Sequence, residues 1–209
     1  MIKHQKIVIV DYGVGNTFSV SNAIRELGYS NLTVTGDQSV ISSADVLILP
    51  GVGAFDEAIR NLSSAKLIDV LNKEVLVNKK PLLGICVGMQ LLATFSEENG
   101  RHEGLNYIPG IVKKLDLPKN FSVPHVGWNN VDFSKKEPLF TKIDRGGNFY
   151  FDHSYHFECD DQFVAAYCDY GVRVTAAVQK ENIFGVQFHP ERSHTSGLKM
   201  FRSFFNSIS

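Results

Sequence analysis

The stretch PLLGICVGMQLL, residues 81 to 92, decides the fold. An apolar run leads up to Cys86, and a helix-like apolar pattern begins directly after it. Such a change of pattern predicts a short buried strand that turns at once into a helix. Gly84 and Gly88 lie two positions either side of Cys86, where glycine lets neighbouring backbone pass without a Cβ clash. The sequence therefore predicts a cysteine on a tight corner between a strand and a helix.

The segment GICVG, residues 84 to 88, has the form G-x-C-x-G, the cysteine counterpart of the G-x-S-x-G nucleophile elbow. In such an elbow the N-terminus of the helix is directed at Cys86 and favours its thiolate. The backbone N–H of Val87 is then placed to donate to an oxyanion. The alternative is a buried structural cysteine, because cysteine is among the most buried residue types. The strand-to-helix context favours the nucleophile.

The segments on either side of this corner predict the rest of the fold. Before it, short apolar strands at 6–10, 31–35 and 45–51 alternate with helical patterns at about 18–27 and 56–79, which is typical of a parallel sheet covered by helices. After it, residues 150–191 are rich in strands, and an amphipathic helix spans 197–208. We interpret the chain as a single α/β domain over residues 1–209, with a mixed, mostly parallel sheet flanked by helices and a β-rich C-terminal half.

Composition excludes several classes of partner. The chain has 209 residues, of which 44% are hydrophobic, and a net charge of -1, which gives no argument for binding nucleic acid or an anionic membrane. The N-terminus lacks a signal-peptide body, and no apolar stretch approaches the ~20 residues that span a bilayer. Three cysteines, Cys86, Cys159 and Cys168, show no metal-binding spacing. We expect a cytoplasmic protein with no nucleic-acid or membrane partner.

The segment FGVQFHPERS, residues 184 to 193, supplies a base and a group to orient it. His189 follows a predicted strand, and Glu191 is two residues further on. Because side chains two apart in an extended segment face the same way, both can point into one site. A cysteine nucleophile needs such a pair. Taken alone, H-P-E is more often a surface turn; together with G-x-C-x-G it favours a Cys86–His189–Glu191 triad.

The segment LPGVGAF, residues 49 to 55, ends another predicted parallel strand. Ligands of open α/β sheets bind at that edge. The glycines there allow backbone N–H groups of Gly51, Val52 or Gly53 to turn toward a substrate oxygen, as a second oxyanion donor. An ordinary turn between strand and helix is the alternative.

These motifs, in this order, resemble those of the class I (triad) glutamine amidotransferases. The resemblance extends over DYGVGN, LPGVGAF, GICVGMQLL, VPHVGWNNV, FYFDHSYHF and FGVQFHPERS. It implies an enzyme that hydrolyses glutamine to glutamate and ammonia through a cysteine thioester, with no cofactor and no metal. His153 and His156 by themselves could suggest a metal, but their spacing and surroundings fit no metal site.

The resemblance also implies roles for individual residues. Cys86 would be the nucleophile, His189 the general base and acid, and Glu191 the carboxylate that orients His189. The other implied roles are the oxyanion hole (Gly51, Val52, Val87), contacts to the substrate glutamine (Gln90, Ser154, Tyr155) and the interface with a partner subunit (Asn16, Trp128, Arg192).

Within that family, the motifs resemble a branch of glutaminase subunits that form a heterodimer with a (β/α)8-barrel subunit. That subunit uses the ammonia to make imidazole glycerol phosphate and AICAR in histidine biosynthesis. Arg192 departs from the branch, which usually has lysine there, and arginine and lysine are not interchangeable at an ion pair. Ser193-His194 and CDYG resemble instead a paralogous branch that supplies ammonia for amidino-sugar synthesis in surface polysaccharide.

Two further interpretations remain open. The chain could be a stand-alone cysteine peptidase or γ-glutamyl hydrolase, active on larger amides without a partner. Gln90 and PHVGWN argue against that reading. It could also be a binding subunit with a relic site, against which the intact Cys86, His189 and Glu191 argue.

Overall fold

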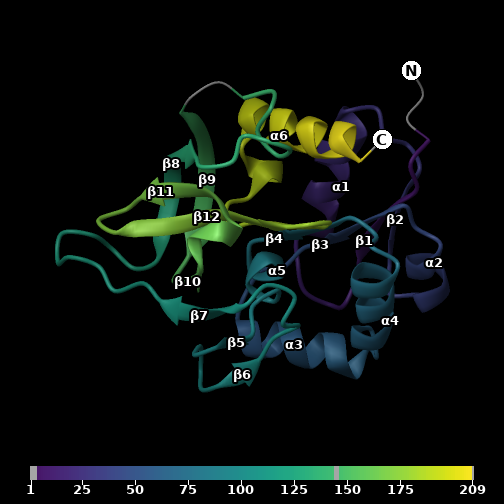
Figure 1. Cartoon of the computed structure of the whole chain (residues 1–209), viewed down its shortest axis with the longest axis horizontal. Helices are drawn as coiled ribbons and strands as arrows, with labels where there is room; N and C mark the ends of the chain where they lie inside the picture. The colour runs from purple at the N-terminus through teal and green to yellow at the C-terminus, as the bar shows by residue number, and fades with distance from the viewer. Residues whose placement is uncertain (1–3, 144–145, 209) are drawn as a thin grey trace.

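A nine-stranded sheet forms the centre of the protein (Figure 1). The structure is a computed structural model that describes residues 4–143 and 146–208. The strands follow one another across this sheet in the order β2 (Leu32–Thr35), β1 (Ile7–Val10), β3 (Val46–Leu49), β4 (Leu82–Ile85), β13 (Ile183–Val186), β12 (Arg173–Lys180), β11 (Val164–Asp169), β8 (His125–Phe133) and β9 (Gly147–His153).

The sheet changes character across its width. From β2 to β13 neighbouring strands are parallel, and from β13 to β9 they are antiparallel. The strands β1, β3, β4 and β13 are buried along their whole length, which explains their continuous apolar sequences. The predicted mixed α/β sheet with a strand-rich C-terminal half is confirmed. A tight turn at Glu181–Asn182 joins β12 to β13.

Helices cover both faces of the sheet. Figure 1 shows α1 and α6 on one face and α3, α4 and α5 on the other. The helices are α1 (Thr17–Glu26), α2 (Gln38–Ser42), α3 (Phe55–Ser64), α4 (Ile68–Asn72), a π-helical turn (Lys73–Val77), α5 (Val87–Gln90) and α6 (His194–Ser207), with short 3-10 turns at Asp161–Phe163 and Pro190–Arg192. None of the helices within 4–143 and 146–208 is long and apolar enough to cross a membrane.

Two local expectations are wrong. The apolar pattern after Cys86 predicts a longer helix, but α5 has only four residues because the chain turns away after Gln90 toward β5 (Phe95–Ser96). Phe18 fits the helical period of residues 18–27, which predicts a buried side chain, yet 74% of it is exposed, because it lies in the first turn of α1 beyond the edge of the core.

A second, four-stranded sheet lies beside the first, in the order β10 (Tyr155–Cys159), β7 (Gly110–Lys114), β5 and β6 (His102–Glu103). The sequence YFDHSYHF reads as one strand-rich run, but the structure divides it at Ser154 between β9 of the first sheet and β10 of the second. Ser154 and Tyr155 therefore lie where the two sheets diverge.

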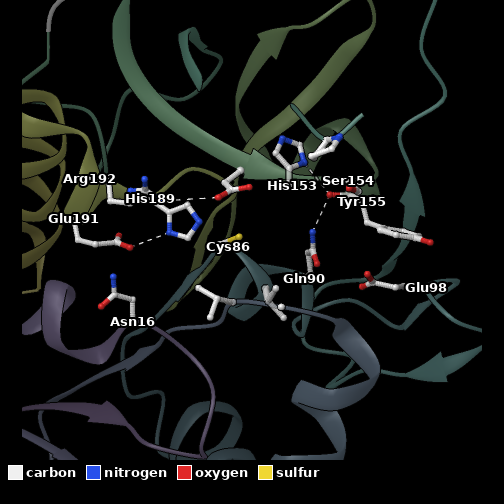
Figure 2. Close-up of a pocket in the computed structure, with 15 residues that line it drawn as sticks. Asn16, Cys86, Gln90, Glu98, His153, Ser154, Tyr155, His189, Glu191 and Arg192 are labelled. Carbon is white, nitrogen blue, oxygen red and sulfur yellow. Dashed lines mark hydrogen bonds and ion pairs between the residues drawn. The ribbon is translucent and has the colours of Figure 1, made fainter. Parts of the chain in front are cut away.

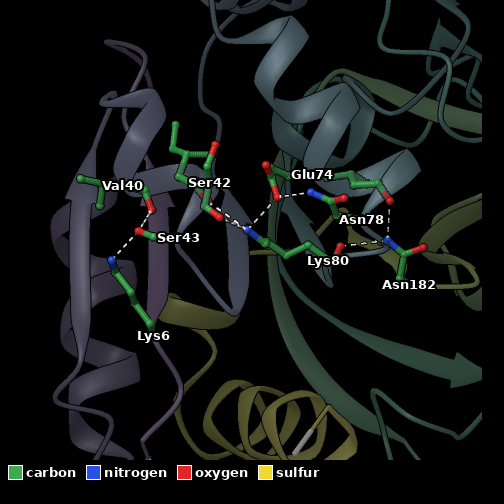
Figure 3. A network of polar contacts seen from close by, with 10 residues as sticks. Lys6, Val40, Ser42, Ser43, Glu74, Asn78, Lys80 and Asn182 are labelled. Carbon is green, nitrogen blue, oxygen red and sulfur yellow. Dashed lines mark hydrogen bonds and ion pairs between the residues drawn. The ribbon is translucent and has the colours of Figure 1, made fainter.

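A buried ion pair joins the helical layer to the parallel half of the sheet (Figure 3). Lys80 Nζ lies 3.0 Å from Glu74 Oε2, and the two side chains are 9% and 4% exposed. Lys80 also donates to the carbonyl of Ser42 at 2.9 Å, and Asn78 donates to the same Glu74 oxygen at 2.9 Å. The Asn78 hydrogen bond, with a further contribution from Lys80, lowers the pKa of Glu74 despite its burial.

We expect Lys80→Met to lower the free energy of unfolding by about 3–5 kcal/mol, because it leaves the Glu74 carboxylate buried without a counter-charge. Urea unfolding monitored by circular dichroism measures the change. The double variant Glu74→Leu/Lys80→Met removes both charges and should regain most of the loss. A single variant as stable as the wild type would show that Glu74 does not need its partner.

Candidate active site

Cys86 lies on a strained corner between β4 and α5, as its sequence predicts. Its φ of 53° and ψ of -112° are sparsely populated for a residue with a side chain. The flanking glycines are required by close packing: a Cβ on Gly84 would lie 2.5 Å from the carbonyl oxygen of Gly88, and one on Gly88 would lie 1.8 Å from that of Leu49. The G-x-C-x-G pattern therefore allows β4, α5 and the end of β3 to approach one another.

A cavity of about 310 Å3 opens above this corner (Figure 2). It lies at the carboxyl ends of three adjacent strands, β3, β4 and β13, the edge at which open α/β sheets bind ligands. Its lining brings together residues from both halves of the sequence, namely Asn16, Val52, Gly53, Cys86, Val87, Gln90, Glu98, Pro124, Asp152, His153, Ser154, Tyr155, His189, Glu191 and Arg192. Its volume is at the lower end of the usual range for small-molecule sites, which suits a ligand of amino-acid size.

His189 and Glu191 point into one site as predicted, although Glu191 lies in the 3-10 turn Pro190–Arg192 and not in an extended segment. His189 Nδ1 lies 2.9 Å from Glu191 Oε1, and the side chains are 6% and 1% exposed. Burial opposes protonation of His189, but the adjacent Cys86, which is hydrogen-bonded to His189, and Glu191 together raise the pKa of the imidazole above its usual value. This favours the imidazolium form of His189 beside Cys86. Glu191 Oε2 is buried with no partner among the described residues.

The backbone around His189 is fixed by hydrogen bonds from β9. The N–H of His189 donates to the carbonyl of Tyr150 at 2.8 Å. The Ser193 hydroxyl donates to the carbonyl of His189 at 2.6 Å and accepts from the N–H of Tyr150 at 3.0 Å. The backbone of His189 is thus held at both its N–H and its carbonyl.

The predicted oxyanion residues either line the cavity beside Cys86 or pack on the corner that carries it. Val87 is the first residue of α5, where backbone N–H groups have no acceptor inside the helix. Val52, Gly53 and Val87 line the cavity. Gly51 lies beneath them and packs on the corner, since a Cβ there would be 2.6 Å from the nitrogen of Gly88.

The predicted substrate contacts Gln90, Ser154 and Tyr155 all line the cavity. Both N–H bonds of the Gln90 amide are used inside the protein, because Nε2 donates to the carbonyl of Tyr155 at 2.9 Å and to Gln187 Oε1 at 3.1 Å. Gln90 therefore has only its carbonyl oxygen left for a ligand.

Two polar residues at the site escaped the sequence analysis. Glu98 lines the cavity and accepts the N–H of Phe55 at 2.9 Å, and burial raises the pKa of its carboxyl. It lies in SEENG, a polar loop with no distinguishing pattern. Gln187 contacts Cys86 and is fully buried. The alternation that placed His189 and Glu191 together, extended back by two residues, would have found Gln187.

The three residues predicted at a partner interface lie around the mouth of the cavity or near it. Asn16 and Arg192 line the cavity, and Asn16 also caps α1 by accepting the N–H of Ser19. The guanidinium of Arg192 lies 4.0 Å from the centre of the Tyr150 ring. Trp128, on β8, is 46% exposed and stacks on His194.

A buried pair of histidines lies behind the cavity. His125 Nδ1 is 3.0 Å from His153 Nε2, and His153 Nδ1 bonds the carbonyl of Tyr155 at 2.9 Å. Burial lowers the pKa of His125 to about 4 and that of His153 to about 3. Both imidazoles are therefore neutral at pH 7. The part of the chain that the structure describes contains no group of three or more histidine, cysteine or acidic side chains arranged to hold a metal ion.

Because the pKa values of both histidines are lower in the folded protein than the usual 6.5, the unfolded chain takes up protons first as the pH falls. We expect the free energy of unfolding to fall between pH 6.5 and about 4, by up to about 1.4 kcal/mol per pH unit for each histidine. His125→Phe, which keeps the stacking between Tyr170 and Phe151, should give a shallower slope in urea unfolding. An unchanged slope would contradict this assignment.

Comparison with known proteins agrees with this architecture. The family model "Glutamine amidotransferase class-I" matches residues 8–208. The chain is 48% identical over 203 residues to "Imidazole glycerol phosphate synthase subunit HisH 2" of Vibrio vulnificus (strain YJ016), covering 97% of this chain and 95% of that protein. It is 47% identical over 199 residues to the protein of the same name from Methanococcus maripaludis, covering 95% and 98%.

Among solved structures, PurLQS from Thermotoga maritima superposes with a TM-score of 0.73 at 19% identity, covering 97% of this chain and 98% of that one. At that identity the likeness concerns the fold alone, and it agrees with the mixed sheet and flanking helices described above. The match to the family model over nearly the whole chain, with relatives above 40% identity, is decisive: this chain belongs to the class-I glutamine amidotransferase family.

Proposed function

We propose that this chain is a single-domain glutaminase subunit, folded as one unit over residues 1–209, that hydrolyses glutamine to glutamate and ammonia. One observation carries the proposal: Cys86, His189 and Glu191 are in contact at the edge of a cavity of amino-acid size. Membership of the class-I glutamine amidotransferase family supports glutamine as the substrate.

Glutamine would bind with its α-ammonium between two acceptors. Glu98 and Gln90 both line the cavity. Because Gln90 uses both of its amide N–H groups inside the protein, its carbonyl oxygen and the Glu98 carboxylate are the groups that can accept from the ligand. The hydroxyl of Ser154, which also lines the cavity, is available to the α-carboxylate. This arrangement directs the side-chain amide of the ligand toward Cys86.

The proposed reaction uses the Cys86 thiolate as the nucleophile and protonated His189 as the acid. The Cys86 thiolate attacks the side-chain amide carbon, and the N–H groups of Val87 and Val52 stabilise the oxyanion. Protonated His189 gives its proton to the departing ammonia, leaving a γ-glutamyl thioester on Cys86. Neutral His189 then removes a proton from water, which attacks the thioester and releases glutamate and the Cys86 thiolate. Glu191 keeps Nδ1 of the imidazole occupied throughout, so that Nε2 faces the reaction.

The ammonia would pass to a (β/α)8-barrel synthase subunit that forms imidazole glycerol phosphate and AICAR in histidine biosynthesis, in a cytoplasmic heterodimer. The names of the relatives from Vibrio and Methanococcus support this acceptor. Asn16, Arg192 and Trp128 would contact that subunit, since Asn16 and Arg192 line the cavity and Trp128 is an exposed large apolar side chain. No cofactor or metal enters the proposed reaction.

Glutamate release from glutamine tests the proposal in three mixtures: the purified chain alone, the chain with the barrel subunit of the same organism, and both with the ribonucleotide substrate of that subunit. We expect a large rise in the full mixture and a smaller one with Trp128→Ala, which removes an exposed anchor. If the chain releases glutamate but the rate does not rise when the barrel subunit and its ribonucleotide are added, the histidine-pathway acceptor would be contradicted and the amidino-sugar partner favoured. No glutamate in any mixture would contradict the glutaminase.

A further inference from the structure

A second polar side chain, besides His189, touches the sulfur of Cys86. Gln187 Nε2 lies 3.7 Å from Cys86 Sγ, and none of the Gln187 side chain is exposed. Gln187 lies just past β13, two residues before His189 in the same extended segment, so these two side chains face the same way. Phe188, between them, points the other way and packs in the core against Phe149.

The orientation of the Gln187 amide is fixed by its neighbours. The carbonyl of Tyr155 can only accept, so Gln90 must turn its amino group toward it. The second hydrogen of that amino group is then directed at Gln187, which must present its carbonyl oxygen there, at 3.1 Å. The amino group of Gln187 is consequently the end that faces Cys86.

The side chains that hydrogen-bond to Cys86 are one charged group and one neutral donor. His189, backed by Glu191, carries the positive charge. Tyr12 is the other titratable group beside Cys86, but its hydroxyl already donates to the carbonyl of Pro50 at 2.5 Å, and burial together with Cys86 raises its pKa. Tyr12 therefore has no hydrogen left for the sulfur. Among the described residues, Gln187 and His189 have hydrogen bonds to Cys86.

We propose that Gln187 is a further catalytic residue: its amide N–H donates a hydrogen bond to Cys86 Sγ and stabilises the thiolate that attacks glutamine. The inference rests on the proposed glutaminase function. Hydrogen bonds to ionised groups are about twice as strong as those between neutral groups, so the donor stabilises the thiolate more than the thiol. Because an amide does not titrate, it does so at any working pH, and Gln90 keeps it from rotating away.

Two substitutions separate this role from a merely structural one. Gln187→Glu keeps the oxygen that accepts from Gln90 but places a second oxygen against the sulfur. Gln187→Met has a similar length and no polar group. Gln179→Met, on the neighbouring strand β12, is the matched control, because Gln179 is partly buried and does not line the cavity.

The measurement is the rate of alkylation of Cys86 by iodoacetamide as a function of pH, followed on the Cys86 peptide by mass spectrometry. Burial raises the pKa of Cys159 and of Cys168 to about 12, so these thiols contribute little background. We expect the pH midpoint of Cys86 alkylation to rise by about one unit in Gln187→Met, which corresponds to about a tenfold lower alkylation rate at pH values below the midpoint. In Gln187→Glu the midpoint should rise further. The Gln179→Met profile should match the wild type.

The pH profiles are compared only between variants whose circular dichroism matches that of the wild type. Gln187→Asn, whose side chain is one methylene shorter, replaces any variant that does not fold. A wild-type midpoint in folded Gln187 variants, with only the KM for glutamine raised, would overturn the proposal and make Gln187 an anchor for Gln90. Alkylation does not require turnover, so this failure is distinguishable from failure of the glutaminase itself, which would appear as absent glutamate release in the wild type.

Discussion

Cys86→Ala is expected to lower glutamate release by a factor on the order of 10⁴ or more, with the fold intact. The loss is this large because the proposed reaction has no path that avoids the thioester, and His189 and the oxyanion donors have nothing to act on without the sulfur. Alanine fits the space, since Cys86 is 3% exposed and alanine removes only one atom. Glutamate assay of the chain with its partner subunit and ribonucleotide measures the effect.

Cys159→Ala is the matched control for this change. Cys159 lies at the end of β10 and does not line the cavity, so its removal should leave glutamate release within about twofold of the wild type. Substantial activity in Cys86→Ala, with equal circular dichroism, would contradict covalent catalysis by Cys86.

Gly88→Ala is expected to damage both the fold and the site, because the added methyl carbon would lie 1.8 Å from the carbonyl oxygen of Leu49. The clash is with backbone, so β3 and α5 must separate, and we expect the free energy of unfolding to fall by at least about 3 kcal/mol. The separation also moves Val52 away from Val87, the two residues proposed to donate to the oxyanion. A displacement of about 1 Å there should lower kcat about 10²-fold.

Gly28→Ala provides the comparison. Gly28 has a φ of 87° and no atom within 4 Å of the added Cβ, so only the backbone conformation is strained and we expect a loss of about 1 kcal/mol with unchanged kcat. Urea unfolding and glutamate release measure the two variants in parallel. If Gly88→Ala lost no more stability and no more kcat than Gly28→Ala, the close approach of β3 to α5 would not explain the G-x-C-x-G pattern.

The corner at Cys86 and the His189–Glu191 pair could be predicted from the sequence, because each depends on residues that are close together in the chain. The glycines around Cys86 indicated a corner, and the structure shows the backbone contacts that exclude side chains at Gly84 and Gly88. The two-residue spacing of His189 and Glu191 indicated a shared face, and their 2.9 Å contact agrees with it. Both predictions rest on local geometry, which a short sequence determines by itself.

What escaped prediction depends on contacts between distant segments. Glu98 faces the cavity because the second sheet places its loop beside α3, and nothing in SEENG records that sheet. The helix after Cys86 stops after Gln90 because the chain must turn into β5, although its apolar pattern continues. Phe18 fits the period of α1 and is nevertheless exposed. Periodicity identifies a helix, but it does not show how far the neighbouring elements extend over it.

The most direct test of the central claim is to treat the native chain with a diazoketone analogue of glutamine and to map the modified residue by peptide mass spectrometry. We expect one modification per chain, on the peptide that contains Cys86. Excess glutamine should slow it and His189→Asn should abolish it, because labelling requires both the bound glutamine skeleton and the Cys86 sulfur held beside His189. Modification of Cys159 or Cys168 instead, or labelling of Cys86 that excess glutamine does not slow, would contradict the claim.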